Sequence, residues 1–517
     1  MDVTTCSQEL AQAHSPTRTR SAFVAVVMIE MWERFGYYGT ASLLVLFMVQ
    51  RLGLSEAQVN LIWGAFSVMI FAMLVIGGWI GDKVLGAKRC LLLGAVTLAL
   101  GYLLLCLSGD RLSYVFTALS VIIVGNALFK PNAANLVRRI YEGSNAHFDS
   151  AFTLYYMGSN FAAAAAVLLT PWVKDRWGWY VAFALCCAGL LVSLIHYAVM
   201  LRKLDGVGSL PDSRPLPKHR FVLVLAGMVV TLFGAIYLLR HSNMGVDCVY
   251  AGGVIVVGIF VHMILRGSRQ ERAGLIAALI LLVEASLFFI FYQQLATSLT
   301  LFALRNVDGN QMLFGHHLFT WSPAQYPAMN AVWILALSPM LAWLYRRLGQ
   351  RDLPVAAKFA IGFGSVAAGF FSFGLSGMVA VHGMVPSWIM LLGYGFYSLG
   401  ELLVAALGLA MISRYVPARM GGFMIGAFFV AGGVAQYLGA MIANLASLPS
   451  QVKNPLLSLP IYTHLFDQLG LLALAGAVIA LALLPFINRL SSTHEACREG
   501  QASTDSQVVA ATQASML

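Results

Sequence analysis

The chain has 517 residues, of which 59% are hydrophobic and only 10% are charged, and its formal net charge is +10. This composition is far more apolar than that of an average soluble protein and excludes a string of ordinary soluble domains. Seven cysteines without a CxxC pair and eleven scattered histidines favour neither a disulfide framework nor a metal site. The sequence therefore predicts a polytopic membrane protein that needs no metal.

About fourteen stretches come close to the 20 or so apolar residues that a membrane span needs. They predict an all-α chain with helical spans near 21–50, 57–81, 90–108, 113–137, 150–172, 178–201, 220–240, 247–265, 273–298, 328–345, 355–379, 386–413, 420–446 and 466–488. With both termini in the cytoplasm, 23 of the 32 Lys and Arg residues fall in inside segments and 7 in outside loops, as the positive-inside rule requires. The net charge of +10 is then explained mostly by the topology of the chain, and partly by attraction to anionic headgroups of the lipid bilayer. No nucleic acid partner is expected.

The polar segments divide this multi-pass chain into parts. Residues 1–20 and 490–517 are predicted to be flexible cytoplasmic tails, because they lack a sustained apolar face. The other predicted parts are an N-terminal six-helix bundle at 21–201, a cytoplasmic linker at 202–219, two inserted transmembrane helices at 220–267 and a C-terminal six-helix bundle at 268–489. GGWIGDKVLGAKR (77–89) has a faint echo in AWLYRRLGQR (342–351), which favours paired repeats.

Six ionisable side chains fall well inside predicted spans. They are Glu30, Glu33, Arg34, Lys130, Glu284 and Glu401. Left unpaired, they would cost about 15 to 20 kcal/mol in total on the insertion scale, which exceeds the roughly 5 to 15 kcal/mol that holds a typical fold together. They must therefore pair with each other or line a wet cavity.

The first span places several of these groups on one helix face. Glu30, Arg34 and Tyr37 recur at i, i+4 and i+7, with Glu33 and Tyr38 beside them, so this face cannot meet lipid. The alternative is an ion pair that only fixes helix packing, although small or neutral residues serve that purpose more readily.

Another base lies in GNALFKPNAAN (125–135). Asn126 and Lys130 lie one turn apart on the same face, and Pro131 removes a backbone donor beside the lysine. A lysine at mid-depth requires an anion. The candidates are Glu33, Glu30 and the carboxylate of a substrate.

Later spans add polar side chains at similar depth. They are Tyr156 and Asn160, Glu284 followed by Tyr292, Gln293 and Gln294, then Asn330 and Glu401. Taken singly, Asn160 or Asn330 is equally well explained by a hydrogen bond between helices. Taken together, the bases Arg34 and Lys130 lie in the first half and the acids Glu284 and Glu401 in the second. Such a cavity suits a small zwitterion such as a peptide or an amino acid.

Several motifs give the chain a resemblance to a known family. They are ExxERFxYYG from Glu30 to Gly39, GGWIGDKVLGAKR, Phe129-Lys130-Pro131, FTLYYMGSN (152–160), QxxTS from Gln294 to Ser298, and Gly400-Glu401-Leu402. Over nearly its whole length outside the tails, the chain resembles the proton-coupled oligopeptide transporters of the major facilitator superfamily, in particular the bacterial dipeptide and tripeptide permeases.

The resemblance implies a symporter that imports dipeptides and tripeptides by alternating access in the bacterial inner membrane, with H⁺ as coupling ion and no cofactor. It implies that Arg34 and Lys130 bind the peptide carboxylate, and that Asn160, Asn330 and Glu401 bind the amino end. Further roles follow in the same way: Glu30 and Glu33 for proton coupling, and Tyr38, Tyr156, Tyr292 and Gln294 for lining the cavity. Glu284 is a candidate for a second proton or gate site, and a monomer is expected.

The chain also departs from the family. Family members often have a tyrosine at the position of Phe71 and a tryptophan at that of Phe428. They often have a serine at the position of Ala405 and a proline at that of Ala331. Anchors for the peptide termini are kept while the side-chain pocket changes, which leaves the range of accepted peptides open.

The mechanism that we expect is a competition. A substrate carboxylate neutralises Arg34 and Lys130, and Glu33 or Glu30 then loses its partner and takes up a proton. Alternatives are a transporter of another small organic acid, drug or peptide-like solute, a sensor that does not transport, and a membrane enzyme. The enzyme is disfavoured because neither a His/Asp/Cys cluster nor a nucleophile elbow is found.

Overall fold

The computed structural model describes residues 16–141, 145–204, 207–241, 244–313, 316–349, 353–414, 421–449 and 454–514. The first half of this part of the chain contains α2 (Pro16–Gln50), α3 (Glu56–Lys83), α4 (Ala87–Cys106), α5 (Leu112–Ile140), α6 (Asn145–Trp177) and α7 (Trp179–Met200). Then follow η1 (Leu201–Leu204), η2 (Leu210–Ser213), α8 (Lys218–Arg240) and α9 (Met244–Arg266).

The second half contains α10 (Arg269–Gln293), α11 (Ser298–Asn306), η3 (Pro323–Gln325), α12 (Ala328–Leu348), α13 (Val355–Gly374), η5 (Leu375–Val379), α14 (Trp388–Arg414), α15 (Gly421–Ala443), η7 (Asn444–Ala446) and α16 (Pro455–Ala514). Its strands are β1 (Val307–Asp308), β2 (Asn310–Leu313), β3 (His316–Thr320) and β4 (Val385–Pro386). The pair β2–β3 is an antiparallel hairpin, and β1 pairs in parallel with β4.

The all-α prediction is confirmed, since every predicted span coincides with a helix. Within the described residues, eleven helices are long and apolar enough to cross a membrane. The helix α2 is not among them, and it is the one that carries Glu30, Glu33 and Arg34.

Three predicted boundaries differ from the structure. The span near 273–298 breaks after α10 and resumes as α11 as far as Asn306, and the last span begins at Pro455 rather than near 466. The expected flexible tail at 490–517 is helical as far as Ala514. Its many Ala, Gln and Glu residues favour helix once the preceding span has nucleated it. Residues 1–15 and the side chain of Ala405 lie outside the described part.

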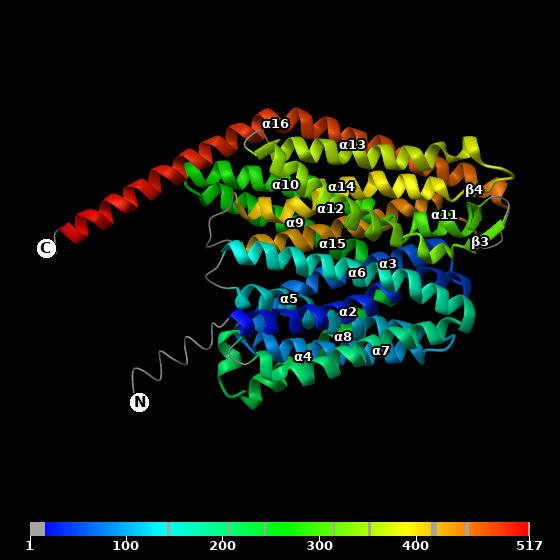
Figure 1. Ribbon diagram of the computed structural model, residues 1–517, viewed down its shortest axis with the longest axis horizontal. Coiled ribbons are helices and arrows are strands. Elements are labelled where there is room, and N and C mark those ends of the chain that lie inside the picture. The colour runs from blue at the N-terminus through cyan, green and yellow to red at the C-terminus, as the bar shows by residue number, and fades with distance from the viewer. Residues whose placement is uncertain are drawn as a thin grey trace.

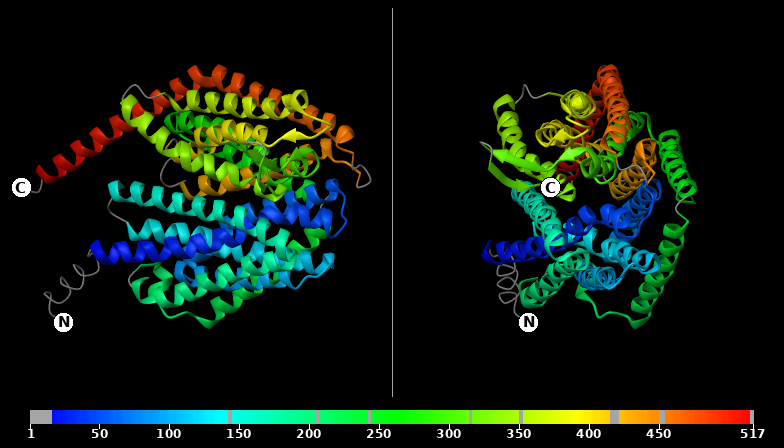
Figure 2. Two further views of the ribbon diagram at one scale, coloured as in Figure 1. Left: turned by 45° about the vertical axis from the view of Figure 1, so that its right-hand side comes forward. Right: turned by 90° about the vertical axis from the view of Figure 1, so that its right-hand side faces the viewer.

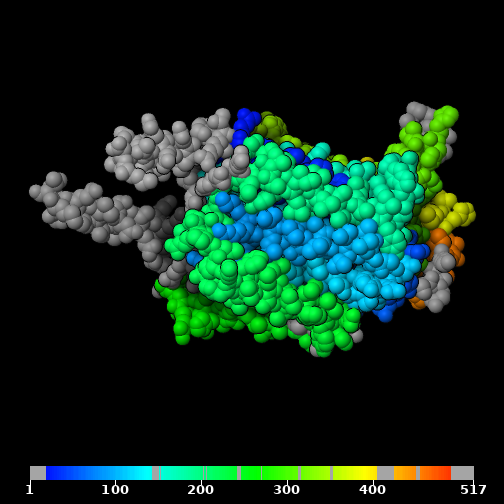
Figure 3. Space-filling view, turned by 90° about the horizontal axis from the view of Figure 1, so that it is seen from below, coloured from blue at the N-terminus to red at the C-terminus, as the bar shows by residue number. Residues whose placement is uncertain are grey.

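The helices form two adjacent bundles. Figure 1 shows α2 to α7 below and α10 to α16 above, with the first and last described helical ends on the same side. We call that side the terminal end, and the side with the β2–β3 hairpin the hairpin end. The inserted helices lie on one flank (Figure 2), where α8 packs against α5, and α9 against α15 and α10. Seen from below, the N-terminal half presents a continuous surface (Figure 3).

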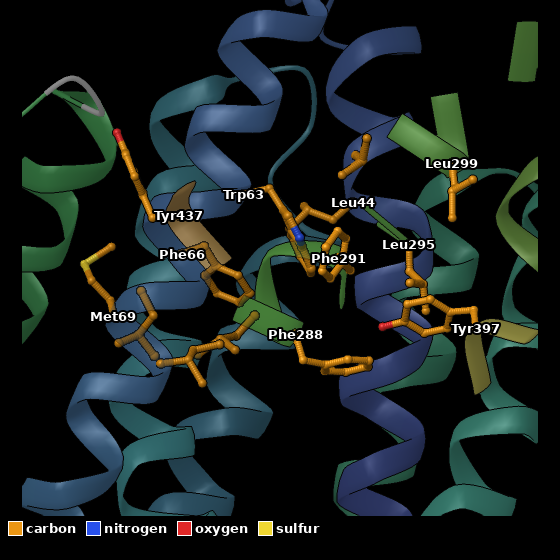
Figure 4. Packing of buried hydrophobic residues seen from close by; sticks show 14 of the residues in the cluster. Leu44, Trp63, Phe66, Met69, Phe288, Phe291, Leu295, Leu299, Tyr397 and Tyr437 are labelled. Atoms are coloured by element: carbon orange, nitrogen blue, oxygen red, sulfur yellow. The ribbon is translucent and has the colours of Figure 1, made fainter. Parts of the chain in front are cut away.

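A single apolar core joins the two halves. In Figure 4, Trp63, Phe66 and Met69 of α3 face Tyr437 of α15 and the α10 residue Phe288. Glycines let these helices approach closely. A Cβ on Gly64 would lie 2.7 Å from the Cβ of Ala440, and a Cβ on Gly433 would lie 3.2 Å from the Cβ of Phe71. The halves therefore meet along a stripe of small residues and aromatic rings.

The polar loop after α3 is held in place by the linker. Ser209 donates to the Gly81 carbonyl at 2.7 Å and accepts from the Ala87 amide at 2.8 Å, while Asp212 accepts from the Lys88 amide at 3.3 Å. Two otherwise unsatisfied amides at the start of α4 are thereby capped.

Close packing of α3 on α5 depends on glycine. A Cβ on Gly77 would lie 1.7 Å from the Ala127 carbonyl oxygen, and a backbone atom cannot move aside cheaply. We expect Gly77→Ala to destabilise the protein by about 1 to 3 kcal/mol and to lower its melting temperature in detergent. Gly227→Ala on α8, where nothing lies within 4 Å, is the matched control and should leave the melting temperature unchanged or raise it slightly. Equal shifts for the two variants would contradict the close contact.

Candidate functional site

The charged groups of α2 form one buried cluster. Arg34 Nη2 lies 2.5 Å from Glu33 Oε2, and Arg34 Nε lies 3.2 Å from Glu30 Oε1. All three residues are at most 3% exposed. The Tyr155 hydroxyl on α6 also bonds Glu30, and Asn126 on α5 donates to Glu33 Oε1 at 3.5 Å. A lone base in this position is thus neutralised by two acids.

The second base of the first half is differently placed. Lys130 is partly exposed, and its ammonium lies 5.8 Å from the centre of the Phe71 ring. In the part of the chain that the structure describes, it forms no salt bridge. It nevertheless interacts electrostatically with Arg34, Glu33 and Glu30. An anion that binds Lys130 therefore also changes the electrostatic potential at the α2 cluster.

The second half contributes a carboxylate on α14. Glu401 on α14 accepts a hydrogen bond from Asn330 on α12 at 2.8 Å, and Asn330 also contacts Ser398 Oγ at 3.0 Å. The bond to Asn330 orients Glu401 through Oε2, while Oε1 accepts no hydrogen bond from the described residues. The sequence analysis did not identify Ser398, because a serine within a span is usually a packing residue.

Tyrosines connect the two groups of charges. Tyr38 of α2 hydrogen-bonds Tyr292 of α10, and Glu401 acts electrostatically on Tyr38, Tyr156 and Tyr292. Tyr156 is 40% exposed, and Glu401 lies near enough to act on it. Asn160, one turn further on α6, donates to the Tyr156 carbonyl at 2.9 Å. Tyr38 and Tyr156 of the first half and Tyr292 of the second therefore lie close to Glu401.

Aromatic rings lie next to Lys130. Phe71 packs against Phe289 and Phe429, with ring centres 5.9 and 6.1 Å apart, and Phe428 packs against Phe289 at 5.7 Å. Two of the four departures from the family, Phe71 and Phe428, therefore belong to one apolar wall.

Two predicted site residues lie apart from this group. Gln294 is fully buried at the break between α10 and α11, where its amide donates to the Gly439 carbonyl at 2.8 Å and its oxygen accepts from Ser298 at 2.6 Å. Glu284 is 6% exposed, and neither of its oxygens has a hydrogen-bond partner in the described part. Gln294 therefore satisfies polar groups at the helix break, and Glu284 is a buried carboxyl group without a hydrogen-bond partner among the described residues.

The QxxTS motif explains that break. Thr297 donates to the Gln293 carbonyl at 2.8 Å, and Thr300 donates to the Leu295 carbonyl at 2.7 Å. A broken helix frees backbone groups that water cannot satisfy inside a membrane, so side chains must do so.

The hairpin end is closed by an ion pair that the sequence did not reveal. Arg305 of α11 donates to Glu56 of α3 at 2.6 Å. The other Glu56 oxygen accepts from the Leu448 amide at 2.9 Å and from Tyr462 at 3.2 Å. The amides of Asn60 and Asn444 also join the halves, at 3.0 Å. Nothing in the sequence pairs Glu56 with Arg305, because the two residues are 249 positions apart.

Similarity to known proteins identifies the family of this chain. A profile of the POT family matches residues 88–463. The chain belongs to the POT family. Its members are transporters and not enzymes, and the chain is accordingly a multi-pass membrane protein of that family.

Named relatives agree with this assignment. The chain is 37% identical to dipeptide and tripeptide permease A of Salmonella typhi over 93% of its own length and 95% of that protein. It is 37% identical to dipeptide and tripeptide permease B of Salmonella typhimurium, over 91% and 96% respectively.

Solved structures of the POT family have the same fold. A bacterial homologue of the human drug peptide transporters PepT1 and PepT2 superposes with a TM-score of 0.83 at 50% identity, over 91% of this chain and 99% of that one. Tetrameric PepTSo2 gives a TM-score of 0.84 at 51% identity, with the same coverage.

The buried pair at the hairpin end can be tested by a double-mutant cycle. Glu56→Gln leaves Arg305 without its carboxylate and should cost about 3 to 5 kcal/mol of unfolding free energy. The Glu56→Gln/Arg305→Gln double variant should cost less than the sum of the single variants, as measured by chemical denaturation in detergent. Asp110→Asn, which breaks the exposed pair with Arg51 at the same end, should leave the unfolding free energy nearly unchanged because solvent screens this pair. Strict additivity would show that Glu56 and Arg305 are not coupled.

Proposed function

We propose that this protein is a proton-coupled symporter that takes up dipeptides and tripeptides. Lys130 is the observation that carries the proposal: it is a base inside a predicted span that forms no salt bridge among the described residues. The other half contributes Glu401, whose Oε1 accepts no hydrogen bond from the described residues. A base in such a place requires an anion. The names of the permease relatives support a peptide as the molecule that supplies it.

A short peptide matches both groups of charges. Its carboxylate would meet Lys130, the partly exposed base next to the buried Arg34 cluster. Its ammonium group would meet the Glu401 oxygen that Asn330 leaves without a hydrogen bond, near Asn160. Each contact is a charge-assisted hydrogen bond in a poorly hydrated site, which is the strongest kind available to protein side chains. Tyr38, Tyr156 and Tyr292 would line the path between the two ends.

Proton coupling follows from the sharing of Arg34. Both Glu30 and Glu33 depend on this single guanidinium. When a peptide carboxylate pairs with Arg34 and Lys130, one of the glutamates loses the positive charge that stabilised it. A buried carboxylate without such a partner takes up a proton. Proton and peptide then cross together, driven by about 2.3 kcal/mol per 100 mV for each charge moved inward.

Alternating access supplies the pathway. The ion pair of Glu56 and Arg305 keeps the hairpin end closed in this conformation, so the site would communicate with the terminal end, where an imported peptide is released. By the distribution of Lys and Arg, the terminal end is proposed to face the cytoplasm of a bacterial inner membrane. The site lies within one chain, so a single chain is proposed as the transporting unit even if copies associate, as tetrameric PepTSo2 does.

The purified protein in liposomes provides the direct test. An inward proton gradient should drive accumulation of labelled dialanine, and unlabelled dipeptides and tripeptides should compete. Competition by small organic acids or drugs but not by peptides would favour the alternative substrate class instead.

Glu33 is the residue that should separate binding from coupling. Glu33→Gln removes the titrating group while keeping its shape, so we expect peptide counterflow to persist and accumulation driven by the proton gradient to fall to background. Both are measured in the same liposomes. Glu271→Gln changes a partly buried acid in the capping box of α10, where glutamine can also accept the bond; it serves as the control and should retain both activities. Normal pH-driven accumulation by Glu33→Gln would reject its coupling role.

Lys130 and Glu401 should each recognise one end of the peptide. Against the wild-type protein, N-acetyl-dialanine and dialanine amide should both compete about 10 to 100-fold more weakly than dialanine, since each lacks one charge-assisted contact. Glu401→Gln should largely lose discrimination against the acetylated peptide and keep it against the amide. Lys130→Gln should do the reverse, as judged by inhibition of counterflow. If the two variants lose the same discrimination, the proposed orientation of the peptide is wrong.

A further inference from the structure

A second cavity lies at the terminal end, away from the peptide site. Its volume is about 320 Å³, and it lies between α2, α7 and η1. Its lining residues are Arg20, Ser21, Val24, Ala25, His196, Met200 and Lys203. Along α2, Glu30 of the peptide site lies five residues beyond Ala25 and ten beyond Arg20, which is about 7.5 and 15 Å of helix.

Among the described residues that line the cavity, the ionisable groups are two bases and a histidine. No carboxylate is among its lining residues. In the described part of the chain, neither Arg20 nor Lys203 forms a salt bridge. Lys203 acts on His196 as a like charge, and the Nε2 atom of His196 is buried without a hydrogen-bond partner. Two cations and an unsatisfied ring nitrogen around one void are stabilised when an anion occupies it.

The surroundings place this void at the edge of the hydrocarbon region. Val24 and Met200 form its apolar wall, and Val24 is 49% exposed. On the same helix as His196, Ile195 and Val199 are 62% and 66% exposed, as lipid-facing residues are. A freely soluble anion would gain nothing from an apolar wall, whereas a lipid presents a phosphate and an acyl chain side by side.

We propose that this cavity binds the headgroup of an anionic phospholipid. Arg20 and Lys203 contact the phosphate oxygens, His196 and the Ser21 hydroxyl supply hydrogen bonds, and the acyl chains lie along Val24 and Met200. Basic pockets between transmembrane helices recognise acidic headgroups in this way. The bound lipid ties α2 to α7, which already meet where Ser193 donates to the Ile29 carbonyl at 3.1 Å. This proposal does not rest on the peptide transport proposed above.

Thermal unfolding of the full-length protein in detergent tests the proposal. The probes are phosphatidylglycerol, cardiolipin, phosphatidylcholine with the same acyl chains, and inorganic phosphate. We expect the two anionic lipids to raise the melting temperature of the wild-type protein, and phosphatidylcholine and phosphate to have little effect. Arg20→Gln/Lys203→Gln should lose most of the stabilisation by anionic lipid.

Two further variants separate a built site from general attraction to positive charge. Lys218→Gln/Arg220→Gln removes two exposed bases at the same end of the molecule that do not line the cavity, and should keep the full lipid effect. Met200→Trp fills the cavity without changing charge, and should abolish it. The melting temperature of each variant without lipid verifies that it folds.

Three results would overturn the proposal. The first is undiminished stabilisation of Arg20→Gln/Lys203→Gln by anionic lipid. The second is an equal loss in the Lys218→Gln/Arg220→Gln control, which would indicate diffuse charge attraction. The third is an equal shift with inorganic phosphate alone, which would assign the cavity to a soluble anion.

Discussion

A charge inside the hydrocarbon region must be paired or must meet water, and the organisation of this protein depends on how α2 satisfies that requirement. Arg34 is held by Glu33 at 2.5 Å and by Glu30 at 3.2 Å. Two acids compensate one base, so the cluster carries an excess negative charge unless a proton or another cation joins it. Lys130, which is near but not in contact, is the cation that the fold provides.

The incomplete pairing of Lys130 gives the site its chemical character. Had Lys130 closed onto Glu33, the first half would be neutral and self-contained, and would attract no anion. Its ammonium instead faces the ring of Phe71, an interaction that stabilises a cation without neutralising it. In the second half, Asn330 orients Glu401 but cannot neutralise it. Opposite charges on the two halves are therefore both incompletely satisfied, which is the basis of the proposal that a zwitterion binds between them.

The same rule applies at the hairpin end and along the broken helix. Glu56 lies at the start of α3, where a carboxylate also meets the positive end of the helix dipole, and Arg305 reaches it from the other half. The break between α10 and α11 is tolerated because Gln294, Thr297 and Thr300 satisfy the freed backbone groups. Polar residues thus close one end of the molecule, while Lys130 and Glu401 both remain partly exposed.

The sequence by itself determined the class of protein, the number of spans and the identity of the charged residues, because hydropathy and the cost of buried charge act locally along the chain. The spacing of Glu30, Glu33 and Arg34 fixed their shared helix face for the same reason. Only the tertiary structure decided which charges meet. It left Lys130 without a salt bridge among the described residues, set Gln294 against α15 rather than among the binding residues, left Glu284 isolated, and joined Glu56 to Arg305 across 249 positions. Such pairings depend on how helices far apart in sequence pack, and no local pattern encodes that packing.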